Sequence, residues 1–249
     1  MSMLGPYASW NKETGYAVWD HPTAEYTGIF ERINVGIKGI IHVGMWDFVE
    51  YGCYTKLVGN KVVGVEANPE VYRTMAKPVA DKWGFKCFNE FTSDKDDEVR
   101  NFYFAGEGSS LYQGQPSWNK QTSIKVQTKT LATVLDENEI DPAEYDFLNI
   151  DAEGSELDIL KGYERYLEHV NVIDLETSYD DRHLSGASHD KIASWLSERG
   201  FELREQSPTY DSQQWGDSVF VRVDRELPPF VDGNAGNAIF GEKYLENSR

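Results

Sequence analysis

Short apolar runs alternate with helix-like segments along most of the 249-residue chain. This alternation is typical of βαβ units, and it predicts an α/β fold with a largely parallel sheet. Apolar runs that we expect to be buried strands lie at 38–44, 61–69, 85–91, 145–151 and 170–177. Helices are expected between them and after them, at 49–59, 69–79, 130–138 and 189–200, with another in the segment ELDILKGYERYL. Alternating apolar and polar residues predict antiparallel or edge strands at 98–106 and 123–130, and a closing strand pair at 201–207 and 217–224.

The chain is expected to form one domain at residues 38–225, because a single α/β domain of this length can bury a substantial core. Residues 1–37 are interpreted as an N-terminal arm or cap. Within it, residues 1–35 are rich in aromatic, glycine and polar residues without a clean period, so we expect an irregular structure. Residues 226–249 are expected to form a C-terminal tail, which begins as a loop.

The charge balance argues against a nucleic-acid partner. The chain has 42 acidic and 24 basic residues, a formal net charge of −18, which repels a polyanion. No run approaches the roughly 18 apolar residues of a membrane span, and the N-terminus lacks a signal-peptide pattern. Cys53 and Cys87 have no CxxC spacing and suggest buried thiols in a reducing compartment. We therefore expect a cytoplasmic protein without a membrane partner.

Residues at two predicted strand ends indicate a nucleoside-like cofactor, because ligands of open parallel sheets bind beyond the carboxyl ends of the strands. Gly44 ends the first strand, and Glu66, an acid suited to the two ribose hydroxyls, follows 22 residues later. Singly, these could be a turn glycine and a solvated acid, but together they favour a cofactor. The GxGxxG pattern of dinucleotide sites is absent. The intervening residues would crowd or repel a pyrophosphate, whereas their acids suit the cationic S-adenosylmethionine; they are Met45, Trp46, Asp47, Phe48 and Glu50.

Four carboxylates gather in the segment FLNIDAEGSELDILKG, residues 147–162. Ser155 is expected to cap the following helix, while Glu156 and Asp158 lie in its first turn, where the helix dipole favours negative charge. Asp151 and Glu153 precede the helix at the carboxyl edge of the strand, so we expect them to face the same crevice as Glu66. The alternative for these two acids is capping or loop bonding.

The sequence resembles the FkbM family of S-adenosylmethionine-dependent methyltransferases over residues 38–223. The most specific element is NIDAEGSELDILKG, which matches the I-D-x-[EQ]-G-[AS]-E core and the L-K-G of the family signature. VEANP, GSSL, an acid-ended IDLET strand and a final WGDSVFVRV occur in the family's order. The resemblance implies a Rossmann-like class I methyltransferase fold: a seven-stranded, mostly parallel sheet with one antiparallel strand and helices on both faces.

Carried over residue by residue, the resemblance also implies a cofactor site. Glu66 would hold the ribose, Asn68 would lie near the adenine, and Asp151 would lie where donor and acceptor meet. The complete implied cofactor set is His42, Gly44, Met45, Glu50, Glu66, Ala67, Asn68, Ser93, Asp94 and Asp151. One departure is that Phe48 stands where the family usually has a second glycine, which leaves open an altered cofactor site.

The expected reaction is O-methylation of a hydroxyl on a sugar or natural-product-like small molecule or glycan. Such a reaction needs alignment and a proton acceptor, for which Asp151 and Glu153 are the candidates. Glu176, at the end of the IDLET strand, and His183 are secondary candidates. We expect a metal-free base, with a divalent ion on Asp151 and Glu176 as the less favoured alternative. The rival functions are a catalytically silent binding or scaffold protein, an NAD-dependent oxidoreductase and, disfavoured by charge, an RNA methyltransferase.

Overall fold

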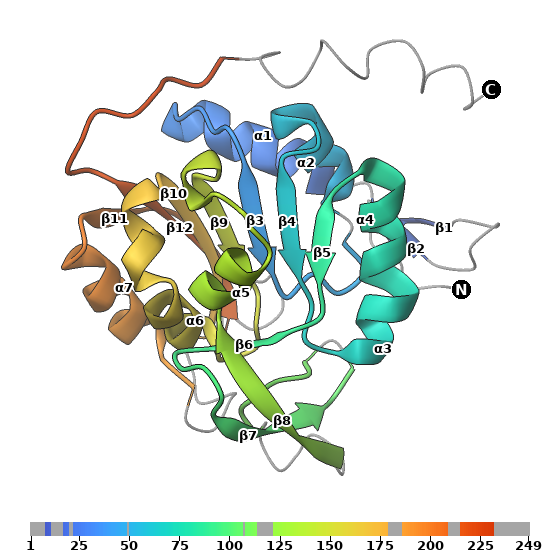
Figure 1. Cartoon of the computed structure of the whole chain (residues 1–249). Coiled ribbons are helices and arrows are strands. Elements are labelled where there is room, and N and C mark those ends of the chain that lie inside the picture. Colours follow the sequence, from blue (N-terminus) through green and yellow to red (C-terminus); the bar gives the residue numbers. More distant parts are fainter. Residues whose placement is uncertain are drawn as a thin grey trace.

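The centre of the protein is a seven-stranded sheet, shown in the computed structural model of Figure 1. The structure describes residues 8–10, 17–19, 22–48, 50–106, 108–113, 122–178, 186–208 and 215–231. The strand order is β11-β12-β10-β9-β3-β4-β5, and only β12 runs antiparallel to its two neighbours. In sheet order the strands are β11 (Phe201–Pro208), β12 (Trp215–Arg222), β10 (Val172–Ser178), β9 (Phe147–Ile150), β3 (Ile40–Val43), β4 (Val62–Val65) and β5 (Lys86–Phe88). This arrangement confirms the predicted fold class.

Helices cover both faces of this sheet, because its strands bury side chains alternately on the two sides. In β3, Ile40 packs into one apolar cluster and the next residue, Ile41, into the other. The cluster of Ile40 includes side chains from α1 (Pro22–Ile33), α2 (Tyr51–Val58) and the helical stretch of α3 (Pro69–Val71), η1 (Tyr72–Ala76) and α4 (Lys77–Trp83). The cluster of Ile41 includes side chains from α5 (Leu131–Glu137), α6 (Glu156–Gly162), η3 (Glu164–His169) and α7 (His189–Ser197). A short turn, η2 (Pro142–Glu144), precedes β9.

A second, three-stranded sheet lies beyond the carboxyl ends of the parallel strands (Figure 1). It consists of β6 (Phe91–Ser93), β8 (Thr122–Thr130) and β7 (Val99–Phe104), with β7 and β8 antiparallel as predicted. The strand predicted at 85–91 is wrong in extent, because β5 ends at Phe88 and β6 starts a different sheet. Between them, Asn89 donates through Nδ2 to the carbonyls of Glu66 and Ala67, at 2.7 and 3.0 Å. This side chain binds the chain to the end of β4 where it leaves the main sheet.

Part of the region expected to be irregular is a helix. Helix α1 spans Pro22–Ile33, and Phe30 is fully buried in the core, where its ring packs edge-on against Phe147 at 5.0 Å. Nearer the N-terminus, β1 (Ala8–Trp10) pairs with β2 (Ala17–Trp19). The proposed domain boundaries remain predictions. Among the described helices, none combines the length and apolar character needed to cross a membrane.

Candidate functional site

An acidic pocket of about 770 Å³ opens at the carboxyl ends of the parallel strands. Its volume lies in the range typical of sites for small molecules and cofactors. The walls come from the loops after β3, β4 and β9, from the facing ends of β10 and β12, and from the turn after β7. The lining residues are Gly44, Met45, Trp46, Asp47, Glu50, Glu66, Asn68, Ala105, Gly108, Ser109, Asp151, Ala152, Glu153, Glu176 and Asp217. Seven of these side chains are carboxylates, and none of the described lining residues is a lysine or arginine.

Glu66 lies at the end of β4 with its carboxylate fixed by backbone amides. Trp46 N donates to Oε2 at 2.9 Å and Asn68 N donates to Oε1 at 2.7 Å. Burial raises the pKa of Glu66, while these amides act in the opposite direction. Each oxygen retains acceptor capacity after these bonds, since a carboxylate has about four lone-pair sites. The carboxylate is therefore held in one orientation and can accept hydrogen bonds from two vicinal hydroxyl groups.

In the loop after β3, the ring of Phe48 lies in the core. Phe48 is fully buried and packs edge-on against His42, Tyr54 and Phe85. Its φ of 56° is in the left-handed region, which glycine adopts without strain. Phe48 thus keeps a glycine-like backbone. Its ring lies in the core and does not narrow the pocket, so the crowding that the sequence left open is not observed.

Met45 lines the pocket, but its side chain is almost fully buried. It is 2 % exposed, and a Cβ placed on Gly64 would lie 1.9 Å from its sulfur. The glycine in the middle of β4 therefore makes room for Met45 beneath the loop. Trp46, with a φ of 45°, remains half-buried in the pocket wall.

Gly44 brings the loops after β3 and β9 into direct contact. Its φ is 87°, and a Cβ at this position would lie 1.6 Å from the carbonyl oxygen of Asp151. Asp151 N donates to Val43 O at 2.9 Å, which continues the strand pairing to the base of the loop. This close approach places Asp151 beside the predicted cofactor loop.

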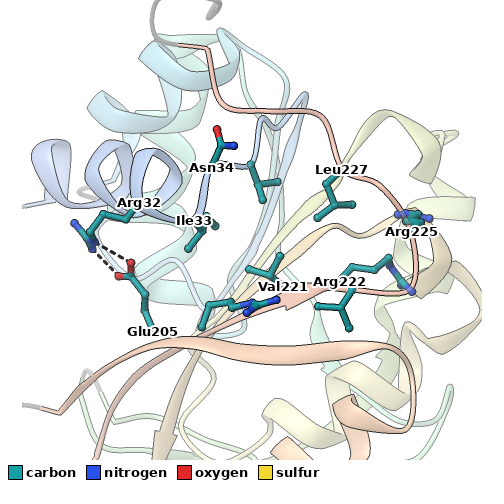
Figure 2. A pocket seen from close by; sticks show the side chains of 11 residues that line it. Arg32, Ile33, Asn34, Glu205, Val221, Arg222, Arg225 and Leu227 are labelled. Atoms are coloured by element: carbon teal, nitrogen blue, oxygen red, sulfur yellow. Dashed lines mark hydrogen bonds and ion pairs between the residues drawn. The ribbon is translucent and has the colours of Figure 1, made fainter.

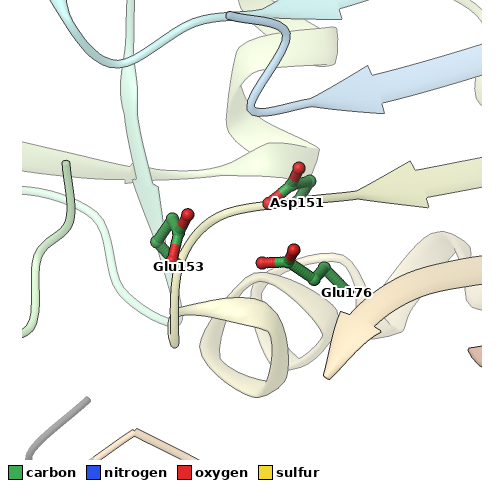
Figure 3. A group of neighbouring side chains, drawn as sticks. All are labelled: Asp151, Glu153 and Glu176. Carbon is green, nitrogen blue, oxygen red and sulfur yellow. The ribbon is translucent and has the colours of Figure 1, made fainter. Parts of the chain in front are cut away.

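Three carboxylates converge on one side of the pocket (Figure 3). Asp151 and Glu153 follow β9, Glu176 lies near the end of β10, and one carboxylate oxygen from each lies within 4.8 Å of the others. Asp151 is accessible from the pocket, although neighbouring protein atoms displace much of the water around its carboxyl group. This desolvation, and then the charges of Glu176 and Glu153, raise the pKa of Asp151 well above its usual value.

Asp217 joins this acidic wall from β12 and was not among the predicted site residues. It is paired in register with Glu176 across the antiparallel β10 and β12 strands, so two acids lie directly opposite each other. Such like-charged pairs are unfavourable in a sheet. The WGD motif contains Asp217, but its position in the pocket depends on the strand register.

Glu156 and Asp158, the two acids in the first turn of α6, make hydrogen bonds that support the local structure. Glu156 Oε1 accepts from Ala152 N and Gly154 N at 3.1 and 2.9 Å, which fixes the loop that carries Glu153 at a φ of 52°. Asp158 Oδ2 accepts from Arg100 Nη1 and from the Tyr112 hydroxyl. Ser155 occupies the N-cap position of α6 as predicted, but its buried Oγ makes no capping hydrogen bond.

Glu50 also lines the pocket, and one of its carboxylate oxygens is buried. Its Oε2 makes no hydrogen bond with any described group, although the side chain as a whole retains some exposure. Burial, with smaller contributions from Asp47 and Asp217, raises the pKa of Glu50 to about 7. An orphaned oxygen of this kind favours a ligand that brings a positive charge or a hydrogen-bond donor.

The other predicted cofactor residues lie outside the pocket lining, apart from Asn68. Asn68 Oδ1 accepts from the amides of Glu70 and Val71 and caps α3. His42 is buried, with Nδ1 3.3 Å from the Tyr54 hydroxyl, and burial lowers its pKa to about 3. Ala67, Ser93 and Asp94 are also outside the lining; Ser93 is fully buried and its Oγ accepts from Arg100 Nη1 at 2.8 Å. His183 lies outside the described residues.

A second pocket, of about 530 Å³, lies at the opposite end of the strands, where β10 begins and β12 ends (Figure 2). Among the described residues, four arginines line it. It adjoins the end of β12, where Val221 pairs with the first residue of β10. Its arginines bind other protein groups. Arg32 makes two bonds to Glu205, and Arg222 and Arg225 donate to backbone carbonyls near the end of η3. These bonds attach β12 to the connection between η3 and β10.

The donor and acceptor set of the acidic pocket fits S-adenosylmethionine. Glu66 offers two oriented acceptors for ribose hydroxyls, and Glu50, whose Oε2 has no described hydrogen-bond partner, lines a pocket that is large enough for the molecule. The described lining residues include seven acids and no lysine or arginine, which suits the cofactor's sulfonium and ammonium groups. The loop that departs from the family pattern keeps its bulky Phe48 out of this space.

Comparison with solved structures gives distant similarities. A structure of M. capricolum TrmK in complex with S-adenosyl-homocysteine has a TM-score of 0.48 at 10% identity, over 82% of this chain and 70% of that one. A putative RNA methyltransferase of Pyrococcus horikoshii has a TM-score of 0.45 at 12% identity, over 83% and 84%. A putative tRNA (m1A22) methyltransferase of Streptococcus pneumoniae, in complex with S-adenosyl-L-methionine, has a TM-score of 0.44 at 13% identity, over 82% and 74%.

Comparison with curated protein sequences gives no match. The profile of the methyltransferase FkbM domain, in contrast, matches residues 35–203, which is more than half of the chain. The match includes the loops after β3, β4 and β9 and the end of β10, and thus most of the acidic pocket. The chain belongs to the FkbM methyltransferase family, and its methyl donor is S-adenosylmethionine.

Proposed function

We propose that the protein transfers a methyl group from S-adenosylmethionine to a hydroxyl group of a sugar or natural-product-like acceptor. The observation that carries the proposal is the convergence of Asp151, Glu153 and Glu176 in the cofactor pocket. A hydroxyl group must lose its proton on methylation, and these carboxylates are available to accept it. A cytosolic location also remains a prediction.

In this proposal the two sides of the pocket have different tasks. The cofactor supplies a methyl group activated by its sulfonium. Glu66 orients the ribose through the two oxygens fixed by Trp46 N and Asn68 N, and Glu50 offers its unpaired oxygen to a cationic group. Asp151, Glu153 and Glu176 orient the acceptor hydroxyl and receive its proton, with Asp151 as the main candidate.

The charge of the pocket favours a small or glycan acceptor over nucleic acid. Seven carboxylates line the described pocket, and no lysine or arginine accompanies them. A phosphate group that approached the methyl donor would meet strong repulsion. An RNA substrate is therefore the disfavoured alternative for this site.

The test is incubation of the full chain with methyl-labelled S-adenosylmethionine and panels of glycans, lipophilic alcohols and RNA. We expect label on a hydroxylated acceptor and a loss of at least about 100-fold in rate for Asp151→Ala, the lower range for a proton-transfer group. Asp97→Asn is the control, because Asp97 is an exposed acid whose φ of 57° asparagine also adopts. Equal transfer by the wild type and Asp151→Ala would refute the assignment of Asp151. Transfer to RNA alone would refute the proposed acceptor class.

A catalytically silent binding protein is the second candidate function. A cofactor-binding measurement distinguishes it from the enzyme. Calorimetry should detect saturable binding of S-adenosylmethionine by the wild type. The absence of binding would favour the scaffold function, whereas saturable binding of NAD in its place would favour an oxidoreductase.

A further inference from the structure

We propose that Asp151, Glu153 and Glu176 together bind a divalent metal ion of the magnesium, manganese or calcium class, which coordinates the acceptor hydroxyl. This inference deepens the proposed function and rests on it. It replaces the expectation of a metal-free base with a site in which the same carboxylates hold an ion.

The geometry of the three acids suits a single hard cation. Such cations take oxygen ligands at about 2.0–2.6 Å, so two ligands of one ion are at most about 4–5 Å apart. Asp151, Glu153 and Glu176 each present one oxygen, and all three oxygens lie within 4.8 Å of one another. Their side chains point toward a common space from the loop after β9 and from β10 (Figure 3). Three protein ligands would leave positions for water and for an acceptor oxygen.

A second observation, outside the three acids, also points to positive charge in this pocket. Glu50 Oε2 is buried at the pocket wall and has no hydrogen-bond partner among the described residues. A buried carboxylate oxygen is costly to leave unpaired, so the site is incomplete without a ligand that carries positive charge or a donor. Glu50 lies in the loop after β3, on a different element from the three acids.

The cofactor would bring only one net positive charge to this acidic pocket. The sulfonium, ammonium and carboxylate groups of S-adenosylmethionine sum to one positive charge. The pocket has seven carboxylates, and two of them, Glu176 and Asp217, lie directly opposite each other on paired strands. A divalent ion adds two positive charges beside this pair and reduces its repulsion.

The ion also has a defined chemical role. Coordination of the acceptor oxygen weakens its O–H bond by stabilising the alkoxide. The proton passes to a carboxylate oxygen that is not bound to the ion, since each of the three residues has a second oxygen. The methyl group then forms a bond to the acceptor oxygen as its bond to sulfur breaks, and the sulfur leaves as a neutral thioether.

The experiment is calorimetric titration of Mn²⁺ into the full chain after treatment with EDTA. We expect one saturable site in the wild type and affinity at least about tenfold weaker in Asp151→Asn and in Glu176→Gln. One control separates the three acids from general surface charge: Asp97→Asn, at an exposed acid outside the pocket, should bind within about threefold of the wild type. Thermal unfolding of each variant verifies that it is folded.

Two results would overturn the metal site: no saturable Mn²⁺ binding by the wild type, or binding that the Asp151 and Glu176 variants leave unchanged. Failure of the proposed function has a different signature, which is the absence of methyl transfer to any hydroxylated acceptor with both cofactor and Mn²⁺ present. If methyl transfer proceeds at full rate in EDTA, the metal site is refuted while the proposed function stands. We expect EDTA to lower the rate at least about tenfold and Mg²⁺ or Mn²⁺ to restore it.

Discussion

Replacement of Glu50 by glutamine should stabilise the protein without ligand and weaken its binding of the cofactor. Burial raises the pKa of Glu50 from 4.5 to about 7, and its Oε2 has no described partner. At about 1.4 kcal/mol per pKa unit, the ionised side chain costs the native state about 3 kcal/mol at pH 8. Glutamine has nearly the same shape and carries no charge, so the variant avoids this cost.

The sign of the effect gives it a distinct pH profile. Below about pH 4.5 the Glu50 carboxyl group is protonated in both states, and its titration makes no difference between the two proteins. Between pH 4.5 and about 7 the unfolded chain releases the proton while the native protein retains it, so wild-type stability falls as the pH rises. The advantage of Glu50→Gln should therefore grow across this window and level off near pH 8.

Denaturant unfolding at pH 4.5, 6, 7 and 8 measures this advantage. Glu31→Gln, at an exposed position of α1, is the control and should remain close to the wild type. In parallel, calorimetry should show that wild-type affinity for S-adenosylmethionine increases as Glu50 ionises, and that Glu50→Gln loses this dependence. An advantage that does not vary with pH, or a variant less stable than the wild type at pH 8, would refute the reasoning.

Three further changes test the packing around the pocket. Phe48→Ala should lower the free energy of unfolding by about 3–5 kcal/mol in denaturant titration, because it empties a fully buried ring position; a change below 1 kcal/mol would contradict the packing described for the loop. Gly44→Ala should prevent the native contact with Asp151, since its Cβ would lie 1.6 Å from the carbonyl oxygen, and a variant with wild-type melting temperature and cofactor affinity would disprove this. Glu156→Ala should cost about 1–3 kcal/mol through the unpaired amides of Ala152 and Gly154, whereas Glu156→Gln keeps an acceptor oxygen and should lose less; equal losses in thermal unfolding would show that the charge matters instead.

Most of the fold could be predicted from the sequence, because buried parallel strands and amphipathic helices have distinct apolar patterns. The core strands, the helix at 189–200 and the antiparallel pair at 98–106 and 123–130 were predicted close to their observed bounds. The strand predicted at 85–91 was not, because its sequence pattern does not reveal that the chain changes sheets at Asn89. One strand ends at Phe88 and the strand of the other sheet begins at Phe91. Helix α1 was missed because its Phe30 is buried by tertiary packing in a sequence with no clean period.

The candidate site could be predicted where chemistry follows from a strand end. Glu66, Asp151, Glu153 and Glu176 were all selected on that basis, and the pocket contains all four. Asp217 was missed because it enters from the antiparallel β12, whose register with β10 is not written in the local sequence.

Side-chain direction was the second limit. The sequence left open whether Phe48, in place of a family glycine, alters the cofactor site, but its backbone has a positive φ and its ring lies in the core. His42 was expected beside the cofactor, yet it is buried between Phe48 and Tyr54. In both cases the direction of one side chain decides whether it lies in the pocket or in the core, and the apolar pattern does not specify that direction.

Calorimetric titration of S-adenosylmethionine into the wild type, Glu66→Gln and the control Glu70→Gln tests the central claim most directly. Glu66 is held in the pocket by two backbone amides, whereas Glu70 is exposed and paired with Arg73. The account predicts one site in the wild type and in Glu70→Gln. The affinity of Glu66→Gln should be at least about tenfold weaker, because glutamine has no charge and can accept fewer hydrogen bonds from the ribose hydroxyls. Equal affinity in all three proteins would contradict the assignment of this pocket as the cofactor site.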